Sequence, residues 1–202
     1  MANFSLHHFL ILFLFFHCIF VKVVTESVTS QNPAATNFIK TSCKNTLYPT
    51  VCIQSLSAYA NTILLNEQQL AQAALSISFK KAKLAADFIS KITKIRGLKP
   101  REFQAAKDCL STMNDSVYQL NRSIPELSQS GQLAAGQDFT WHVSNVQTWI
   151  SAALTDENAC LDMFNNPSMD GKIKALVRAR VFAAAQVTSN ALALVYHFAE
   201  RH

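Results

Sequence analysis

The sequence predicts an all-helical protein: an up-down-up-down four-helix bundle over about residues 66–202, preceded by a short helical hairpin over about residues 37–60. Gly, which commonly ends helices, occurs only four times among 202 residues, whereas Ala, the strongest helix former, is abundant. Apolar residues recur every three or four positions through four long segments, which is the period of an amphipathic helix. No segment alternates apolar and polar residues over a useful length, so we expect no strands.

The first 25 residues have the composition of a secretory signal peptide. The run from Phe9 to Val21 is almost entirely apolar, and as a helix it spans about 20 Å, short of the roughly 30 Å hydrocarbon core of a membrane. We therefore expect cleavage near Thr25, with a retained membrane anchor as the alternative. Residues 26–36 are polar and rich in Ser and Thr, and we interpret them as a mobile leader.

Cleavage of the signal peptide, which contains Cys18, leaves four cysteines in the chain. An even number in a secreted chain implies two disulfides, and three pairings are possible, between which spacing does not decide. We favour Cys43–Cys52 and Cys109–Cys160, because each pair then closes a local unit of the chain. The first pair would close the helical hairpin, in which Pro49 falls in the first turn of the second helix.

Four apolar stripes define the helices of the bundle. The first consists of Leu70, Ala74, Ile77, Leu84, Phe88, Ile92 and Ile95. The second, from Phe103 to Leu127, is the most regular, but Pro125 should end its helix early or kink it. The third helix is expected to begin with Asp138 as its N-cap, and Glu157 interrupts its stripe. The fourth stripe runs from Ile173 to Phe198.

Sequence motifs for catalysis or metal binding are missing. No HExxH or paired CxxC pattern is present for a metal, no GxSxG elbow for a nucleophile, and the glycines are too few for a nucleotide-binding loop. We interpret Asp138 as a helix cap and His142, four residues later on the same helix face, as an exposed residue. Trp141 and Trp149 are interpreted as core or groove packing. We therefore expect no enzymatic activity, no cofactor and no metal.

The formal net charge is +5, and the basic residues cluster between Lys80 and Arg101 and between Lys172 and Arg180. We interpret these clusters as solvated helix faces, with binding of an acidic polysaccharide as the alternative. Secretion argues against nucleic acid as a partner, and no membrane contact is expected once the signal peptide is removed.

Two N-glycosylation sequons lie in the second helix, at Asn114 and Asn121. Seven residues make nearly two helical turns, so both asparagines lie on one side of the helix, displaced from the apolar stripe. Both should face solvent; whether they carry glycans is left open.

Two segments resemble a known family. The run Phe38–Cys43, followed by Leu47–Pro49 and Val51–Cys52, is similar to the opening of the plant invertase/pectin methylesterase inhibitors. The run Val146–Cys160 resembles the segment around that family's fourth cysteine. The resemblance implies the Cys43–Cys52 and Cys109–Cys160 disulfides, the hairpin and the bundle, with residues 37–202 as one inhibitor domain.

The resemblance also implies a function, the non-covalent inhibition of a plant carbohydrate-active enzyme in the cell wall. In such complexes with pectin methylesterase, the inhibitor lies across the substrate cleft and excludes pectin. By resemblance, the residues that would face the enzyme in a one-to-one complex are Asp115, Thr155, Asp156 and Asp162. Ala159 stands where relatives often carry Thr, and a glycan on Asn114 would lie beside Asp115.

The target stays open between two enzymes. Invertase inhibitors tend to carry a Pro-Lys-Phe motif after the second helix, and here that stretch is Gly136–Phe139, without the motif. We therefore favour pectin methylesterase over invertase. Carboxylates at the interface would make the affinity depend on pH. A non-inhibitory bundle that binds acidic wall polysaccharide is the alternative from a different functional class.

Overall fold

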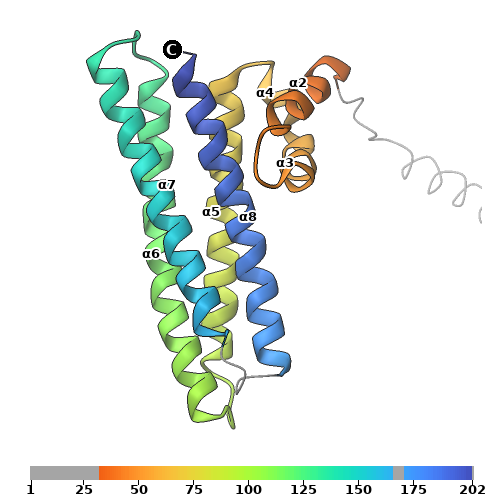
Figure 1. Ribbon diagram of the computed structural model, residues 1–202, viewed down its shortest axis with the longest axis vertical. Coiled ribbons are helices and arrows are strands. Elements are labelled where there is room, and N and C mark those ends of the chain that lie inside the picture. The colour runs from red at the N-terminus through yellow and green to blue at the C-terminus, as the bar shows by residue number, and fades with distance from the viewer. Residues whose placement is uncertain (1–31, 166–170, 202) are drawn as a thin grey trace, which may run out of the picture. The chain divides into compact units, whose positions relative to one another are not determined.

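The computed structural model describes residues 32–165 and 171–201. Its four long helices are α5 Glu67–Ile92, α6 Pro100–Ser130, α7 Gln137–Met163 and α8 Lys172–Glu200. Consecutive helices run in opposite directions and pack side by side, and α8 closes the bundle by packing on α5 (Figure 1). The predicted all-helical up-down-up-down bundle is confirmed, and the described residues contain no strand. The predicted signal peptide, residues 1–25, and residues 26–31 of the leader lie outside the described residues.

Short helices precede the bundle. They are α2 Pro33–Cys43, α3 Pro49–Leu56 and α4 Ala60–Ile63, with one 3₁₀ turn, Ser57–Tyr59, between the last two. Helix α2 begins four residues before the expected start, so residues 33–36 are helix rather than leader. The Asn32 side chain accepts a 3.0 Å hydrogen bond from the Ala34 N–H, Pro33 favours a first turn, and Ala35 is buried.

The hairpin is attached to α5 and α8 by a second apolar core. Ile39 of α2 and Leu56 of α3 are buried together with Ile77 of α5 and Leu194 of α8. At the turn between α2 and α3, the Tyr48 N–H donates to the Asn190 side chain at 3.1 Å, and the Asn190 amide donates back to the Tyr48 carbonyl at 3.0 Å. This pair of hydrogen bonds joins the hairpin turn to α8.

Two disulfides link the cysteines in the pairs that the sequence analysis favoured. Cys43–Cys52 joins α2 to α3, and Cys109–Cys160 joins α6 to α7, where the two Cα atoms lie 4.4 Å apart. All four cysteines are buried. The second bridge therefore holds α6 and α7 in close contact and in a set register.

The buried face of α5 differs from the predicted stripe in its second half. Leu84 is 64% exposed and Ile95 is 47% exposed, and the chain instead buries Ala82, Ala85 and Ile89. The small alanines continue the helical period from Leu75 and let the neighbouring helices approach closely. Residue size misled the prediction at Leu84, which lies on the outer side of α5 while the smaller Ala82 and Ala85 are buried.

Two predicted helix boundaries on α6 and α7 are wrong. Helix α6 continues through Pro125 to Ser130, because Leu127 and Ser130 beyond the proline are buried in the core. Pro125 has no N–H to donate to the Asn121 carbonyl, so the helix lacks that hydrogen bond. Helix α7 begins at Gln137 after Gly136, so Asp138 lies inside its first turn and is not the N-cap.

Among the described helices, α8 alone has the length and apolar composition of a membrane span. It packs against α5, α7 and the hairpin, and Val181, Ala191 and Val195 are fully buried. These features are those of a core helix in a bundle.

Candidate binding surface on α6 and α7

The outer junction of α6 and α7 carries polar and aromatic side chains from both helices. We call this surface the α6–α7 seam and define it by Asp115, Tyr118, Arg122 and Glu126 of α6 with His142, Asn145, Trp149 and Asp156 of α7. Residues three, four and seven apart share one side of a helix. The spacing within each set therefore places its members along one line, which runs beside the other helix.

The middle of the seam is a cation–aromatic stack. The Arg122 guanidinium lies 3.6 Å from the centroid of the Trp149 ring and 5.7 Å from that of Tyr118. Tyr118 is 62% exposed, while Arg122 and Trp149 are half-buried. Trp, Tyr and Arg are the residues that most often dominate the free energy of protein–protein binding. This composition is typical of a docking surface.

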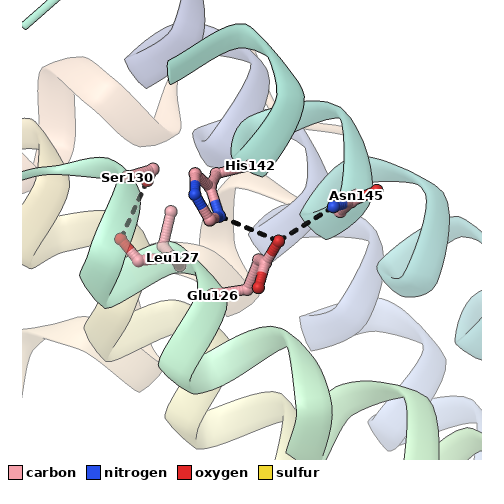
Figure 2. Close-up of polar contacts among 5 residues, drawn as sticks. All are labelled: Glu126, Leu127, Ser130, His142 and Asn145. Carbon is pink, nitrogen blue, oxygen red and sulfur yellow. Dashed lines mark hydrogen bonds and ion pairs between the residues drawn. The ribbon is translucent and has the colours of Figure 1, made fainter. Parts of the chain in front are cut away.

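One end of the seam is a hydrogen-bonded cluster around Glu126 (Figure 2). The Asn145 amide donates to the Glu126 carboxylate at 2.9 Å, and His142 Nδ1 lies 3.0 Å from the same oxygen. His142 therefore binds across to α6 and is not the simple exposed neighbour of a cap that the sequence suggested. Nearby, Ser130 donates to the Leu127 carbonyl within α6 at 2.9 Å. The cluster connects the end of α6 to the start of α7.

The other end of the seam is acidic. Asp115 lies six residues after Cys109 and Asp156 four before Cys160, so in antiparallel helices both lie on the same side of the disulfide, about 9 Å and 6 Å along the axis. Partial burial, and then the charge of Asp115, raise the pKa of the Asp156 carboxyl. The two carboxylates therefore interact, as their similar height predicts.

A buried carboxyl lies directly behind this acidic end. Glu157 is fully buried, and its Oε1 accepts hydrogen bonds from Ser116 of α6 at 3.0 Å and Thr188 of α8 at 3.1 Å. Its Oε2 has no hydrogen-bond partner in the described part of the chain. Burial raises the pKa of Glu157 to about 8 against the two hydrogen bonds, which lower it. The acid is therefore mainly protonated at the pH of a weakly acidic medium.

The side chains of the seam have the chemistry of a binding surface. In residues 32–165 and 171–201, no group of three or more His, Cys, Asp or Glu side chains is placed to hold a metal ion. Trp141 is not part of the seam; it lines an open surface pocket on α7 with Gln137, Thr140 and Ser144. Trp141 is 65% exposed, so the prediction of core or groove packing is wrong for this residue. Trp149 is half-buried against Arg122 of α6, in agreement with groove packing.

Known proteins resemble the chain over most of its length. The sequence pattern of the plant invertase/pectin methylesterase inhibitor family matches residues 37–194. The chain belongs to this family.

Individual relatives agree with the family match. A 21 kDa protein of Daucus carota is 49% identical over 91% of this chain and 95% of its own length. Pectinesterase inhibitor 9 of Arabidopsis thaliana is 49% identical over 88% of both chains. A crystal structure of a mutant pectin methylesterase inhibitor from Arabidopsis superimposes with a TM-score of 0.62 at 21% identity, covering 78% of this chain and 95% of that one. Membership in a family of inhibitors confirms the expectation that the chain is not itself an enzyme.

The four residues that the family resemblance singled out fall into two groups. Asp115 and Asp156 lie together in the α6–α7 seam. Thr155 and Asp162, seven residues apart, share the outward face of α7, and both are exposed. Thr155 donates to the Ser151 carbonyl at 3.0 Å, and Asp162 accepts from the Asn165 amide at 2.8 Å. Together the two groups form a patch that extends from the seam over the outside of α7.

The two sequon asparagines of this inhibitor-family chain are exposed beside the seam. Ser116, one residue after Asp115, points to Glu157 on α7. Asn114, one residue before Asp115 and about 100° round the helix in the other direction, is therefore turned away from α7. Asn121 lies on the same side as Asn114. Tyr118 lies four residues after Asn114 and three before Asn121, so a glycan at either residue would lie beside Tyr118 at the edge of the seam.

Sequence reasoning missed Arg122 and Glu157 as residues of interest. Arg122 is the middle residue of the second sequon, and nothing else in the sequence draws attention to it. Its stack on Trp149 joins α6 to α7, and from the sequence these helices are paired only by the bundle topology. The helical spacing of Trp149 and Asp156, seven residues apart on α7, was the available signal for a common face. Glu157 interrupted a predicted apolar stripe, and such a residue at a core position is a sign of a buried polar contact.

Proposed function

We propose that the protein is a secreted inhibitor of pectin methylesterase that binds the enzyme non-covalently and one to one. The observation that carries the proposal is the 49% identity to Pectinesterase inhibitor 9, over 88% of both chains. The absence of the Pro-Lys-Phe motif at Gly136–Phe139 favours this target over invertase.

The α6–α7 seam is the surface that we assign to the enzyme. Asp115, Thr155, Asp156 and Asp162 supply carboxylates and a hydroxyl, and the Arg122–Trp149 stack supplies a rigid, partly apolar centre. A polar patch with an aromatic–Arg centre has the composition of a protein–protein interface. Docked over the substrate cleft, the rigid bundle would exclude the pectin chain by occupying its path, and no covalent step is needed.

Secretion to the cell wall is part of the proposal. It is supported by the apolar run Phe9–Val21 and by two buried disulfides, which are maintained in oxidising compartments. Amino-terminal sequencing of the protein recovered from a plant apoplast would test it. A new terminus near Thr25 is expected, and recovery of the intact amino terminus would contradict it.

The decisive experiment is an inhibition assay of the purified mature protein against pectin methylesterase and invertase in parallel. Saturable inhibition of pectin methylesterase, with one inhibitor per enzyme by size-exclusion chromatography with light scattering, is the expected result. Inhibition of invertase alone would overturn the assigned target. Inhibition of neither enzyme, with binding to acidic polysaccharide, would replace the proposal with the non-inhibitory wall-binding alternative.

A further inference from the structure

A second surface of the molecule has features that enzyme inhibition does not use. A groove of about 610 Å³ lies between the hairpin and the bundle, formed by α3, the turn Ser57–Tyr59, α5 and α8. Its volume falls within the range of ligand-binding pockets. The hairpin packs on α5 and α8, whereas the seam belongs to α6 and α7 (Figure 1). A ligand in the groove therefore leaves the seam free.

The groove is cationic. Lys80 and Lys81 are exposed at its edge, and no lining residue carries a carboxylate. Within the described part of the chain, neither lysine has an ion pair, whereas Lys83 on the same helix is paired with Asp87 at 3.5 Å. The two ammonium groups are therefore available to an anionic ligand.

The remaining lining residues suit a sugar. Tyr59 lies under the Lys80 ammonium, 5.9 Å from the ring centroid, and Leu84 adds an exposed apolar surface. Gln54, Ser55 and Gln186 add polar side chains that can bond hydroxyl groups. An aromatic ring, neutral hydrogen-bonding groups and two ammonium groups together match a ligand with both hydroxyls and carboxylates. The groove is open to solvent and not an enclosed cavity, so a segment of a longer chain can lie in it.

We propose that this groove binds an acidic polysaccharide, a segment of a linear uronic acid chain, with Lys80 and Lys81 on its carboxylates and Tyr59 against a sugar ring. The charge complementarity selects a de-esterified chain over an esterified one, since methyl esters remove the anionic groups. The inhibitor would then be retained where carboxylates have been exposed in the wall, with its seam still open to the enzyme.

The test is direct binding of an oligogalacturonate to the purified mature protein by isothermal titration calorimetry at low ionic strength. The probe is compared with its fully methyl-esterified form. The K80Q/K81Q variant removes both groove charges, and the K91Q/K94Q variant removes the same charge from the same stretch of chain outside the groove. We expect K80Q/K81Q to weaken binding at least tenfold and K91Q/K94Q to change it less than threefold.

Several results would overturn the proposal. These are no binding of the oligogalacturonate by the unaltered protein, equal binding of the esterified probe, or equal losses in both variants, which would indicate charge attraction without a site. The assay contains no enzyme, so its outcome is independent of whether the protein inhibits pectin methylesterase. In a parallel inhibition assay, K80Q/K81Q is expected to inhibit like the unaltered protein, because the seam is untouched.

Discussion

Ser116 of α6 donates a 3.0 Å hydrogen bond to the carboxyl of Glu157 on α7, in a fully buried position behind the acidic end of the α6–α7 seam. Thr188 of α8 donates to the same oxygen. One carboxyl thus joins three of the four bundle helices, next in sequence to Asp156.

Glu157 predicts that the fold loses stability as the pH rises. Its pKa is about 8 in the folded protein against an ordinary value of 4.5. The folded state therefore holds the proton more tightly than the unfolded state does. The resulting stabilisation is complete below about pH 4.5 and declines as the pH rises towards 8, by at most about 1.4 kcal/mol per pH unit.

The measurement is chemical denaturation of the unaltered protein and Glu157→Gln between pH 4.5 and pH 8. Gln keeps an oxygen that can accept from Ser116 and Thr188 but cannot ionise. We expect the free energy of unfolding to fall more steeply with pH in the unaltered protein than in the variant. Parallel profiles would show that Glu157 does not titrate in this range.

The Arg122–Trp149 stack predicts a concentration of binding free energy in the centre of the seam. Replacing either residue by Ala should weaken inhibition of pectin methylesterase at least tenfold, because each removes a large, pre-ordered contact surface. A double-mutant cycle should give a coupling of about 0.5–2 kcal/mol between the two residues. Lys94→Ala, in the turn after α5, is the control and should change the inhibition constant less than twofold. Additive effects of the two seam variants would contradict a functional stack.

Replacing Asp156 by Asn is predicted to affect the stability of the fold and the inhibition of the enzyme differently. Asp156→Asn removes a partly buried charge that faces Asp115, so it should leave thermal stability unchanged or raise it slightly at pH 7, by less than about 1 kcal/mol. The same change should weaken inhibition, since a carboxylate is lost from the proposed contact face. Thermal unfolding and the inhibition constant are measured on one preparation. Undiminished inhibition would remove Asp156 from the contact face.

The Cys109–Cys160 bridge predicts a large loss of stability on removal. The two residues are 51 apart in sequence, and loop entropy alone assigns a bridge of that span about 4 kcal/mol. The C109A/C160A variant should show a lower denaturation midpoint by fluorescence. The shorter Cys43–Cys52 bridge is worth about 3 kcal/mol by the same reasoning, and C43A/C52A is the matched comparison. A larger loss on removing the short bridge would contradict this ranking.

The helices could be predicted from sequence because each buries a periodic apolar face, but the choice of face could not always be predicted. On α5, the large side chain Leu84 lies outside while Ala82 and Ala85 lie inside. The spacing of the apolar residues alone would allow either face of α5 to be buried there. Only the position of the neighbouring helices decides which face is buried. On α6, burial of Leu127 maintains the helix beyond Pro125, which local propensity would have ended.

Only part of the binding surface could be predicted from the sequence. The common height of Asp115 and Asp156 follows from the Cys109–Cys160 disulfide, because a bridge between antiparallel helices sets their register. The stack of Arg122 on Trp149 could not be predicted, because nothing in either helix alone records which residue lies opposite.

The sequence by itself determined four amphipathic helices, a helical hairpin and the inhibitor family, since these depend on local spacing and on recognisable runs around the cysteines. Spacing left three cysteine pairings possible, and the family resemblance implied the pairing that the structure shows. Only the tertiary structure decided that Glu157 lies in the core, that Arg122 meets Trp149, and that Lys80 and Lys81 border a groove beneath the hairpin. The physical reason is that each of these depends on contacts between helices far apart in the chain. Helix period and residue type constrain such contacts but do not specify them.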